Sequence, residues 1–317
     1  MAATTLVLSL LLTGCRLFTP TPQKLVMATA FVPFALLGYA VAALAWWAVR
    51  RLGVRGRRRL VSTGALAASL LGLAFHAVLA VPSYAGSHAS GRPALTVLTS
   101  NLRLGLGDTR EVTRIAERYH ADVVVLEEVT PVAFAGLEPL RDQLPYLVGE
   151  PFAGARGTIV LSRYPLRDAT PLKVFNGAWV MTVAAPDPFS LVAVHTSQPW
   201  AAPLLWKSDH RSLLWNTTLA TRRGPVVMAG DFNATLDHRP MRDLLALGLS
   251  DAARQANAGW QPTWPSDRDA THALPFGMGA MAIDHVLVSK EFSAISTRTF
   301  VVRNSDHRAL LARLARE

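Results

Sequence analysis

Cysteine and acidic residues are scarce in parts of this chain, and each scarcity excludes an interpretation. Cys15 is the only cysteine among 317 residues, so no disulfide can form within one chain. Residues 1–89 contain no Asp or Glu, although eight of the 32 Lys and Arg residues lie there. The other 24 basic residues face 22 acidic ones, so residues 90–317 are nearly neutral despite a net charge of +10 for the whole chain. No basic track for a polyanion is therefore evident in that part, and no internal repeat is present.

Two long uncharged runs predict membrane spans. Residues 25–49 and 60–81 are each long enough to cross a bilayer, and Trp46 and Trp47 end the first run where interfacial aromatics gather. The loop between them, residues 50–59, carries six arginines. The positive-inside rule places this loop in the cytoplasm and everything after about residue 85 outside it. A nucleic-acid patch is the weaker interpretation of the arginines, because both neighbouring segments are apolar.

Residues 2–15 fit two interpretations. This uncharged stretch matches either a short first transmembrane helix or the apolar part of a signal segment. Leu12–Cys15 resembles a lipoprotein cleavage box, but no Lys or Arg precedes the apolar run. His76, inside the second long run, is either a functional intramembrane group or a histidine that faces a neighbouring helix. The expected organisation is a membrane anchor of two or three helices over residues 1–85, a linker over 86–93 and a soluble domain over 94–317.

From residue 94 onwards the pattern is that of an α/β domain. Residues 95–100 alternate and predict a half-buried strand, and the β-branched run 122–126 predicts a fully buried one. Asp108 and Glu111 form a capping box that predicts a helix as far as about residue 119. Further strands are expected over residues 157–162, 178–184, 191–195, 225–229, 282–289, 297–302 and 307–314, and helices over 200–220 and 239–249.

The segment Val226–Ala234 ends a buried apolar run in Gly-Asp-Phe-Asn. Side chains two residues apart on an extended chain point to the same face, so Asp231 and Asn233 are expected to look into one cleft. The alternative is a strand followed by an Asx-type turn, since Asp, Asn and Gly are common turn residues.

Polar side chains recur at the ends of the expected strands. Active sites of layered α/β folds are built from strand ends and the loops that follow them. Taken singly, each residue has a simpler explanation, such as a turn residue, a helix-terminal charge, a cap or a satisfied core histidine. Together and in one order they predict a site. These residues are Asn101, Glu128, His195, Asp231, Asn233, Asp284, Asp306 and His307.

The segments around these residues carry a family resemblance. They are Asn101, Asp122–Val129, Gly157–Leu166, Val194–Thr196, Gly230–Asn233, Ile283–Val286 and Ser305–His307. In this order they resemble the successive blocks of the endonuclease/exonuclease/phosphatase superfamily, which includes DNase I-like nucleases, inositol-polyphosphate phosphatases and sphingomyelinases. The resemblance covers residues 94–317. It implies a four-layer α/β/β/α sandwich that hydrolyses phosphate esters with a divalent ion, Mg²⁺ or Mn²⁺.

The resemblance also implies a metal site. Glu128 stands in the family's glutamate position and would be the first metal ligand, with Asn101 beside it and Asp306 near the metal. Mg²⁺ prefers hard oxygen ligands and keeps several waters, so one or two carboxylates suffice. Arg103, two residues after Asn101, would bind substrate.

Five further residues receive catalytic roles from the resemblance. Asp231 would hold and deprotonate the attacking water, and Asn233 would orient the water or the phosphate. His307 would donate to a phosphate oxygen as charge builds in the transition state. Asp284 would hold that imidazole by its other nitrogen and raise its pKa. His195 would make a second phosphate contact.

Two positions depart from patterns in the family. Many members have Gln before the metal-binding Glu, but this chain has Glu127. This carboxylate either recruits a second ion or faces away, and strand alternation favours the second. Arg103 stands where apurinic endonucleases have an acidic residue, which argues against abasic-site repair.

Three substrate classes fit the sequence, namely extracellular nucleic acid, a phospholipid head group at the lipid bilayer and a small phosphate ester. No protein partner is inferred. The segment Trp260–Pro265 would stack on a base or sugar, touch lipid, or pack as a loop. The alternative function is a catalytically silent, membrane-tethered binding module. The retention of every expected chemical residue argues against it. A transporter would need more spans, or polar residues within them.

Overall fold

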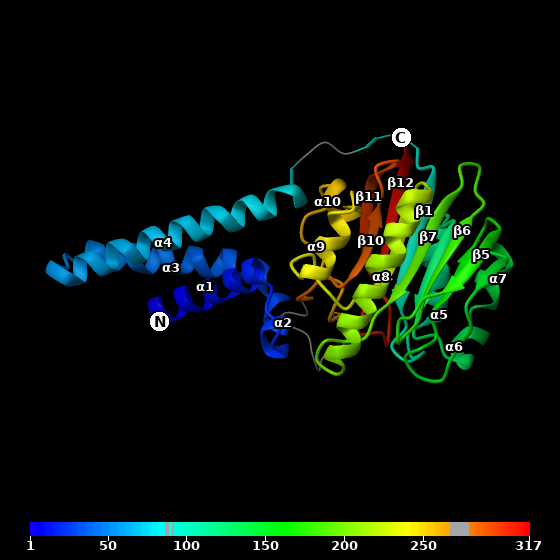
Figure 1. The fold of residues 1–317 in the computed structure, drawn as a ribbon, viewed down its shortest axis with the longest axis horizontal. Helices are drawn as coiled ribbons and strands as arrows, with labels where there is room; N and C mark the ends of the chain where they lie inside the picture. Colours follow the sequence, from blue (N-terminus) through cyan, green and yellow to red (C-terminus); the bar gives the residue numbers. More distant parts are fainter. Residues whose placement is uncertain (86–88, 91, 267–278) are drawn as a thin grey trace. The chain divides into compact units, whose positions relative to one another are not determined.

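A computed structural model describes residues 1–85, 89–90, 92–266 and 279–317. The chain forms two units, residues 1–82 with 237–239 and residues 83–236 with 240–317. They are taken one at a time below (Figure 1). The linker expected over residues 86–93 lies mostly outside the described residues.

The first unit is helical, as its apolar runs predict. Two stretches, Val32–Arg51 and Gly56–Ser83, are long and apolar enough to cross a membrane, and a third span results if the bent pair α1 and α2 is counted as one. The expected span over residues 25–49 is wrong at its start, because the helix is interrupted between α2 and α3. Pro33 lies in this interruption; proline has no N–H and its ring clashes with the carbonyl four residues earlier. The helices are α1 (Ala2–Phe18), α2 (Gln23–Thr29), η1 (Val32–Phe34), α3 (Ala35–Arg51), α4 (Gly56–Ala80) and η2 (Val81–Ser83).

A polar network joins three helices of this unit. The Oγ1 of Thr13 on α1 lies 2.7 Å from the Tyr39 hydroxyl on α3 and 2.9 Å from His76 Nε2 on α4. Gly72 permits this packing, since a Cβ there would lie 2.3 Å from Tyr39 Cε1. His76 therefore faces neighbouring helices, which agrees with the simpler of its two interpretations.

The second unit contains two six-stranded sheets. The first has the order β11-β12-β1-β2-β4-β3 and the second β5-β6-β7-β8-β10-β9. Neighbours are antiparallel except for the parallel pairs β1–β2 and β7–β8. The strands are β1 (Leu95–Asn101), β2 (Val123–Glu127), β3 (Tyr146–Val148), β4 (Ile159–Ser162), β5 (Leu166–Pro171), β6 (Ala178–Val183), β7 (Phe189–His195), β8 (Val226–Asp231), β9 (Ser250–Asp251), β10 (Asp284–Val288), β11 (Phe292–Val301) and β12 (Arg308–Arg316).

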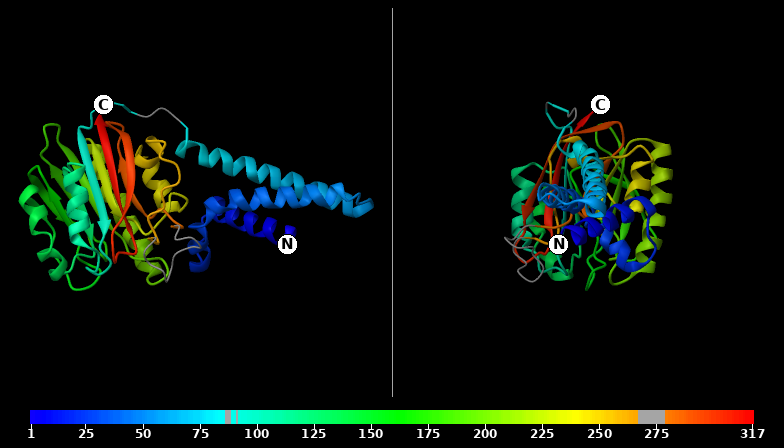
Figure 2. Two further views of the ribbon diagram at one scale, coloured as in Figure 1. Left: turned by 180° about the vertical axis from the view of Figure 1, so that it is seen from behind. Right: turned by 90° about the vertical axis from the view of Figure 1, so that its left-hand side faces the viewer.

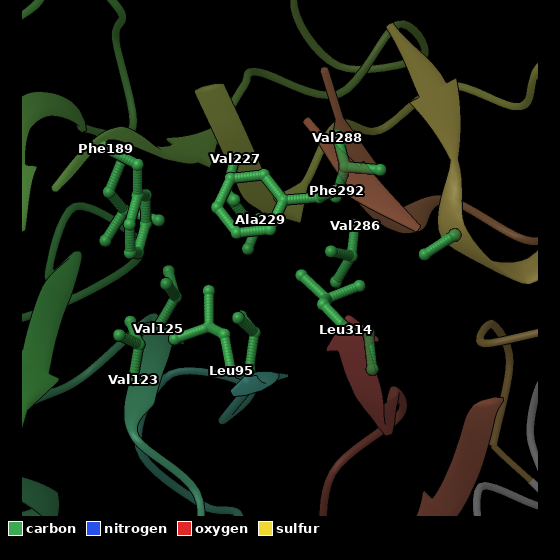
Figure 3. Close-up of a cluster of buried hydrophobic side chains, with 14 of the residues drawn as sticks. Leu95, Val123, Val125, Phe189, Val227, Ala229, Val286, Val288, Phe292 and Leu314 are labelled. Carbon is green, nitrogen blue, oxygen red and sulfur yellow. The ribbon is translucent and has the colours of Figure 1, made fainter. Parts of the chain in front are cut away.

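The two sheets pack face to face over one apolar core and helices cover their outer faces (Figures 1 and 2). Figure 3 shows that core, where Val125 of one sheet and Val227 of the other are fully buried. Leu126 points to the opposite side and packs with Val112 of α5, while Thr217 of α8 contacts Met228. The predicted α/β/β/α sandwich is confirmed. The helices are α5 (Thr109–Arg118), α6 (Pro131–Ala135), α7 (Glu138–Gln143), α8 (Pro203–Arg223), α9 (Arg239–Leu245) and α10 (Ala252–Gln255).

The differences from the expected elements lie mainly at edges and ends. The capping box is confirmed in part, since Asp108 accepts hydrogen bonds at the start of α5 but Glu111 accepts from Arg303 N. Strands β3, β5 and β9 and helices α6, α7 and α10 were not expected. Strand β5 is an exposed edge strand without apolar alternation, so no period of two reveals it. Helix α8 begins at Pro203, a residue favoured in the first turn.

Candidate active site

The polar residues at the strand ends come together at one end of the sandwich. Asn101 ends β1, Glu128 follows β2, and His195 ends β7 beside Asp231 at the end of β8. Asp284 begins the antiparallel β10 and is paired directly with Asp231. The parallel pairs β1–β2 and β7–β8 end at this edge, and the antiparallel β10 begins there. Side chains from both sheets are thereby brought together. The amino end of α8, which follows β7, lies at the lower end of the domain in Figure 1.

Asn101 links the carboxylates of the two sheets. Its Nδ2 donates to Glu128 Oε1 at 3.3 Å and to Asp231 Oδ2 at 3.1 Å, while its Oδ1 accepts from Arg103 N at 2.8 Å. The predicted neighbourhood of Asn101 and Glu128 is therefore present. The amide, however, turns its nitrogen rather than its oxygen toward the carboxylates, so in this arrangement it holds them by hydrogen bonds.

Asp231 and Asn233 are close neighbours, as predicted, but a turn after β8 and not the extended strand brings them together. Asn233 N donates to Asp231 Oδ1 at 2.8 Å, and Asn233 Nδ2 donates to Asp231 Oδ2 at 3.2 Å and to Thr196 O at 2.9 Å. Asn233 has a left-handed φ of 46°. The local geometry is therefore that of the alternative interpretation, a strand followed by an Asx turn, and the turn brings the amide to the carboxylate.

Burial sets the protonation of Asp231. The carboxyl is 1% exposed, and burial, opposed by the charge of His307 and reinforced by that of Asp284, raises its pKa to about 7. A carboxyl with a pKa near neutrality can take a proton from water during a reaction.

His307 is held by a carboxylate, as the sequence predicts. Its Nδ1 lies 2.9 Å from Asp284 Oδ2 and its Nε2 lies 3.8 Å from Asp231 Oδ2. Burial alone would lower the pKa of His307, but the negative charges of Asp284 and Asp231 raise it well above its ordinary value. These charges therefore favour the protonated imidazole, and Nε2 is directed toward Asp231.

His195 is a neutral imidazole close to the carboxylates of Glu128 and Asp231. Its Nε2 lies 3.7 Å from Glu128 Oε1 and 3.8 Å from Asp231 Oδ2, and its ring is fully buried. Burial, together with the positive charge of His307, lowers its pKa to about 3. Asn176, which no sequence argument singled out, places its Nδ2 3.3 Å from this Nε2 and donates to Thr196 O at 3.1 Å.

Asp209 on α8 is a second residue that the sequence did not reveal. Its Oδ1 accepts from Phe175 N at 3.1 Å, and its Oδ2 accepts from Ser197 N and Oγ, both at 2.8 Å. One buried carboxylate thereby fixes the loop that carries Asn176 and the loop that follows His195. Asn176–Gly177 before β6 was the available signal, but such a pair is equally a turn.

Glu128 and Glu127 are both buried carboxylates that accept hydrogen bonds. Leu104 N donates to Glu128 Oε2 at 2.6 Å. Burial and, to a smaller extent, the charge of Asp306 raise the pKa of Glu128, while its hydrogen bonds with Leu104 and Asn101 lower it. Glu127 is fully buried and accepts from Thr99 Oγ1 at 2.9 Å. Glu127 shares a strand face with Val123 and Val125, which pack between the two sheets, and burial with the charges of Asp284 and Asp231 raises its pKa.

The backbone of Glu128 leaves the strand conformation, since its φ is 57°. Strand alternation ends at Glu127. The next residue adopts the left-handed region, so its side chain is not directed to the opposite face of the sheet.

Arg103 and Asp306 lie at the margins of this cluster. Arg103 begins the loop after β1 and has a φ of 47°. Asp306 Oδ2 accepts from Trp264 Nε1 at 3.4 Å, and the Trp264 ring stacks on Trp200 with centroids 6.0 Å apart. Part of the Trp260–Pro265 segment therefore contacts a predicted site residue.

A group of possible metal ligands overlaps the predicted catalytic residues. Asp231, Asp284 and His307 offer ligand atoms within 4.8 Å of one another, in the part of the chain that the structure describes. Glu128 joins them through Asn101. The site thus concentrates buried carboxylates around one charged imidazole.

Comparisons with known proteins agree with this arrangement. A family model, Endonuclease/Exonuclease/phosphatase family, matches residues 98–307. The chain therefore belongs to the Endonuclease/Exonuclease/phosphatase family, and its activity is the hydrolysis of phosphoric ester bonds. No curated protein sequence matches the chain.

Solved structures share the fold at low identity. An endonuclease/exonuclease/phosphatase from Beutenbergia cavernae is 21% identical with a TM-score of 0.54, over 70% of this chain and 71% of that one. D. rerio TDP2, complexed with a single-strand DNA product, is 15% identical with a TM-score of 0.59, over 70% and 98%. The Neisseria 3′ phosphatase NExo, bound to a product DNA hairpin, is 19% identical with a TM-score of 0.56, over 70% and 99%.

Proposed function

We propose that the protein is a metal-dependent phosphoesterase, anchored in a membrane by its N-terminal helices, with its catalytic domain outside the cytoplasm. The observation that carries the catalytic part is the buried contact set of Asp231 with Asn233, His307 and Asn101. It supplies a base, an orienting amide and a charged donor around one point.

The residues present fit a divalent cation. Glu128 and Asp231 are both buried, both have raised pKa values and are bridged by one amide, so a cation would favour their charged forms and lower those pKa values. Glu128, with Asp306 nearby and Asn101 beside it, would hold Mg²⁺ or Mn²⁺. The bound ion would supply charge neutralisation at the phosphate. Ligation by the Asn101 oxygen would require its amide to turn over.

The chain's own residues take the proton of the attacking water and stabilise the charge that builds on the phosphate. Asp231 takes a proton from water as the water oxygen bonds to phosphorus, and the bond from phosphorus to the ester oxygen breaks. The departing oxygen takes a proton from solvent. His307, fixed by Asp284, donates through Nε2 to a phosphate oxygen on which charge builds, and Asn233 orients the water. His195, held by Asn176, makes the second phosphate contact.

The catalytic proposal is tested with the full chain in detergent, stripped of metal by EDTA. We expect turnover of bis(4-nitrophenyl) phosphate to return with Mg²⁺ or Mn²⁺ and to fall by about 10²- to 10⁴-fold in Asp231→Asn. Asp251→Asn, which alters a buried carboxylate outside the site, is the matched control. EDTA-resistant turnover, or full rates in Asp231→Asn, would contradict the proposal. Metal binding by calorimetry without any turnover would favour the binding module.

The orientation rests on the arginines between the two candidate spans. A cysteine at Leu52, placed in a Cys15→Ser background, should react with an impermeant reagent only after cells are permeabilised. A cysteine at Asp187, an exposed position of the catalytic domain, should react in intact cells. The reverse pattern would overturn the topology.

A further inference from the structure

The backbone segments around the active site expose large apolar side chains. The exposed fractions are 51% for Leu104, 60% for Leu106, 49% for Phe152, 45% for Phe175, 47% for Trp200 and 78% for Leu204. We call these six residues the apolar rim. Exposed apolar side chains that gather on one region mark ligand grooves, protein interfaces or membrane-contacting surfaces.

On the side of the first sheet, the rim is fixed directly to site residues. Leu104 N donates to Glu128 Oε2 at 2.6 Å, and Leu106 N donates to Arg103 O at 3.0 Å within the same loop. Phe152 N donates at 2.9 Å to the carbonyl of Val129, the residue after Glu128. These exposed residues therefore lie on segments whose backbone is hydrogen-bonded to Glu128 or to the residue after it.

On the side of the second sheet, the same relation holds. Phe175 precedes Asn176, whose amide contacts His195. Trp200 stacks on Trp264, which donates to Asp306. Leu204 lies in the first turn of α8, the helix whose Trp206 Nε1 donates to Asn233 O at 3.1 Å. The rim thus has members on both sides of the polar centre.

The charge of these segments suits one phosphate rather than a chain of phosphates. Arg156 lies over the ring of Phe175 at 4.2 Å, and Arg103 begins the loop of Leu104. Residues 90–317 carry 24 basic and 22 acidic residues, whereas tight binding to nucleic acid needs several cations placed along its backbone. Three of the six rim residues are leucines, which offer no flat surface on which a base can stack.

We propose that the apolar rim contacts the hydrocarbon boundary of a bilayer, and that the substrate is a phosphate ester of a membrane lipid. Apolar side chains leave water when they enter that boundary, while the lipid phosphate reaches the polar centre. The same chain carries two candidate membrane spans, so the catalytic domain is covalently tethered to such a surface. This inference rests on the proposed function and names its substrate class.

The test measures the ratio of lipid to soluble-ester turnover by the full chain. Wild type and variants are assayed on phosphatidylglycerol, phosphatidylcholine and phosphatidic acid in mixed micelles, and on bis(4-nitrophenyl) phosphate. The double variant Leu106→Ser with Leu204→Ser should lower the ratio at least tenfold. Trp215→Ser, 68% exposed and about 16 Å further along α8, and Leu147→Ser, 41% exposed on β3, should leave it unchanged.

The outcomes separate this inference from the proposed function. Soluble-ester turnover with no lipid turnover, or an equal ratio in rim and control variants, overturns the lipid substrate and leaves the phosphoesterase intact. Cleavage of a single-stranded oligonucleotide in place of lipid assigns the site to nucleic acid. Absence of turnover of every ester tested, lipid and soluble, in the wild type refutes the proposed function. Circular dichroism of each variant confirms that it is folded.

Discussion

The hydrogen bond between Asp284 and His307 sets the charge of the proposed phosphate donor. It joins Oδ2 and Nδ1 at 2.9 Å, with the two residues only 2% and 6% exposed. Burial opposes the charged imidazole, and the charge of Asp284 is the largest influence that raises the pKa of His307. The charged form is therefore present below this raised pKa and is lost as pH rises through it.

Asp284→Asn keeps the shape of the side chain and removes its charge. The loss of the charged imidazole, and with it the alkaline limb of the activity profile, should then move to lower pH. A hydrogen bond to a charged group contributes about 1.5–3 kcal/mol. If the transition state uses that bond, kcat/KM near neutral pH should fall by about 10- to 150-fold. The pH–rate profile of the full chain on a soluble phosphodiester measures both effects.

A matched control lies on the same strand. His285 Nδ1 contacts Asp251 Oδ2 at 3.1 Å, which is a second buried carboxylate–imidazole pair outside the site. Asp251→Asn should alter stability without moving the alkaline limb. If Asp284→Asn folds and its alkaline limb stays at the wild-type position, the assignment of His307 as the charged donor is refuted.

Three further predictions concern stability. Gly230→Ala should destabilise the catalytic domain by at least about 3 kcal/mol in denaturant unfolding, because φ is 143° and a Cβ would lie 1.9 Å from a backbone carbonyl of the neighbouring strand. Asp108→Ala should cost about 0.5–2 kcal/mol at pH 7 through loss of the α5 cap. Burial would raise the pKa of Asp108, but hydrogen bonds from Arg303 and Arg110 lower it; its contribution is therefore present above the unfolded-state pKa, and the difference from wild type should shrink as pH falls through the folded-state pKa. Thr13→Val should weaken the helical unit by about 1 kcal/mol in detergent unfolding, since two interhelical hydrogen bonds are lost, and an unchanged transition would contradict that role.

The strand framework could be predicted because its chemistry is local. Buried β-branched runs such as Val123–Leu126 have one consistent interpretation, and the polar residue that follows each run marks the place where the strand leaves the core. Asp231 could be placed at a strand end on this basis, whereas Asp284 begins β10 and meets Asp231 through the antiparallel pairing of β10 with β8. Edge strands such as Leu166–Pro171 have no buried face, so the same signal is missing.

The supporting residues could not be predicted because their partners are distant in the chain. Asp209 lies mid-helix, where an acidic residue is ordinarily a solvated surface group, yet it is 2% exposed and binds two loops. Only the tertiary arrangement brings Phe175 and Ser197 to its two oxygens. Asn176 is similar, because it lies before β6 whereas its contact partner His195 ends β7.

The site also depends on backbone conformations that the residue types conceal. Arg103, Glu128 and Asn233 each lie one or two residues after a strand that ends at the site. Each has a left-handed φ of 46–57° without being glycine. Such conformations cost of order 1–3 kcal/mol each and persist only where the surroundings impose them. Here each one ends strand alternation and redirects a side chain or backbone N–H: Arg103 N to Asn101, Glu128 toward Leu104 N, and Asn233 onto Asp231. An argument from alternation therefore holds up to the last strand residue, Asn101, Glu127 or Asp231, and fails in the one or two residues that follow.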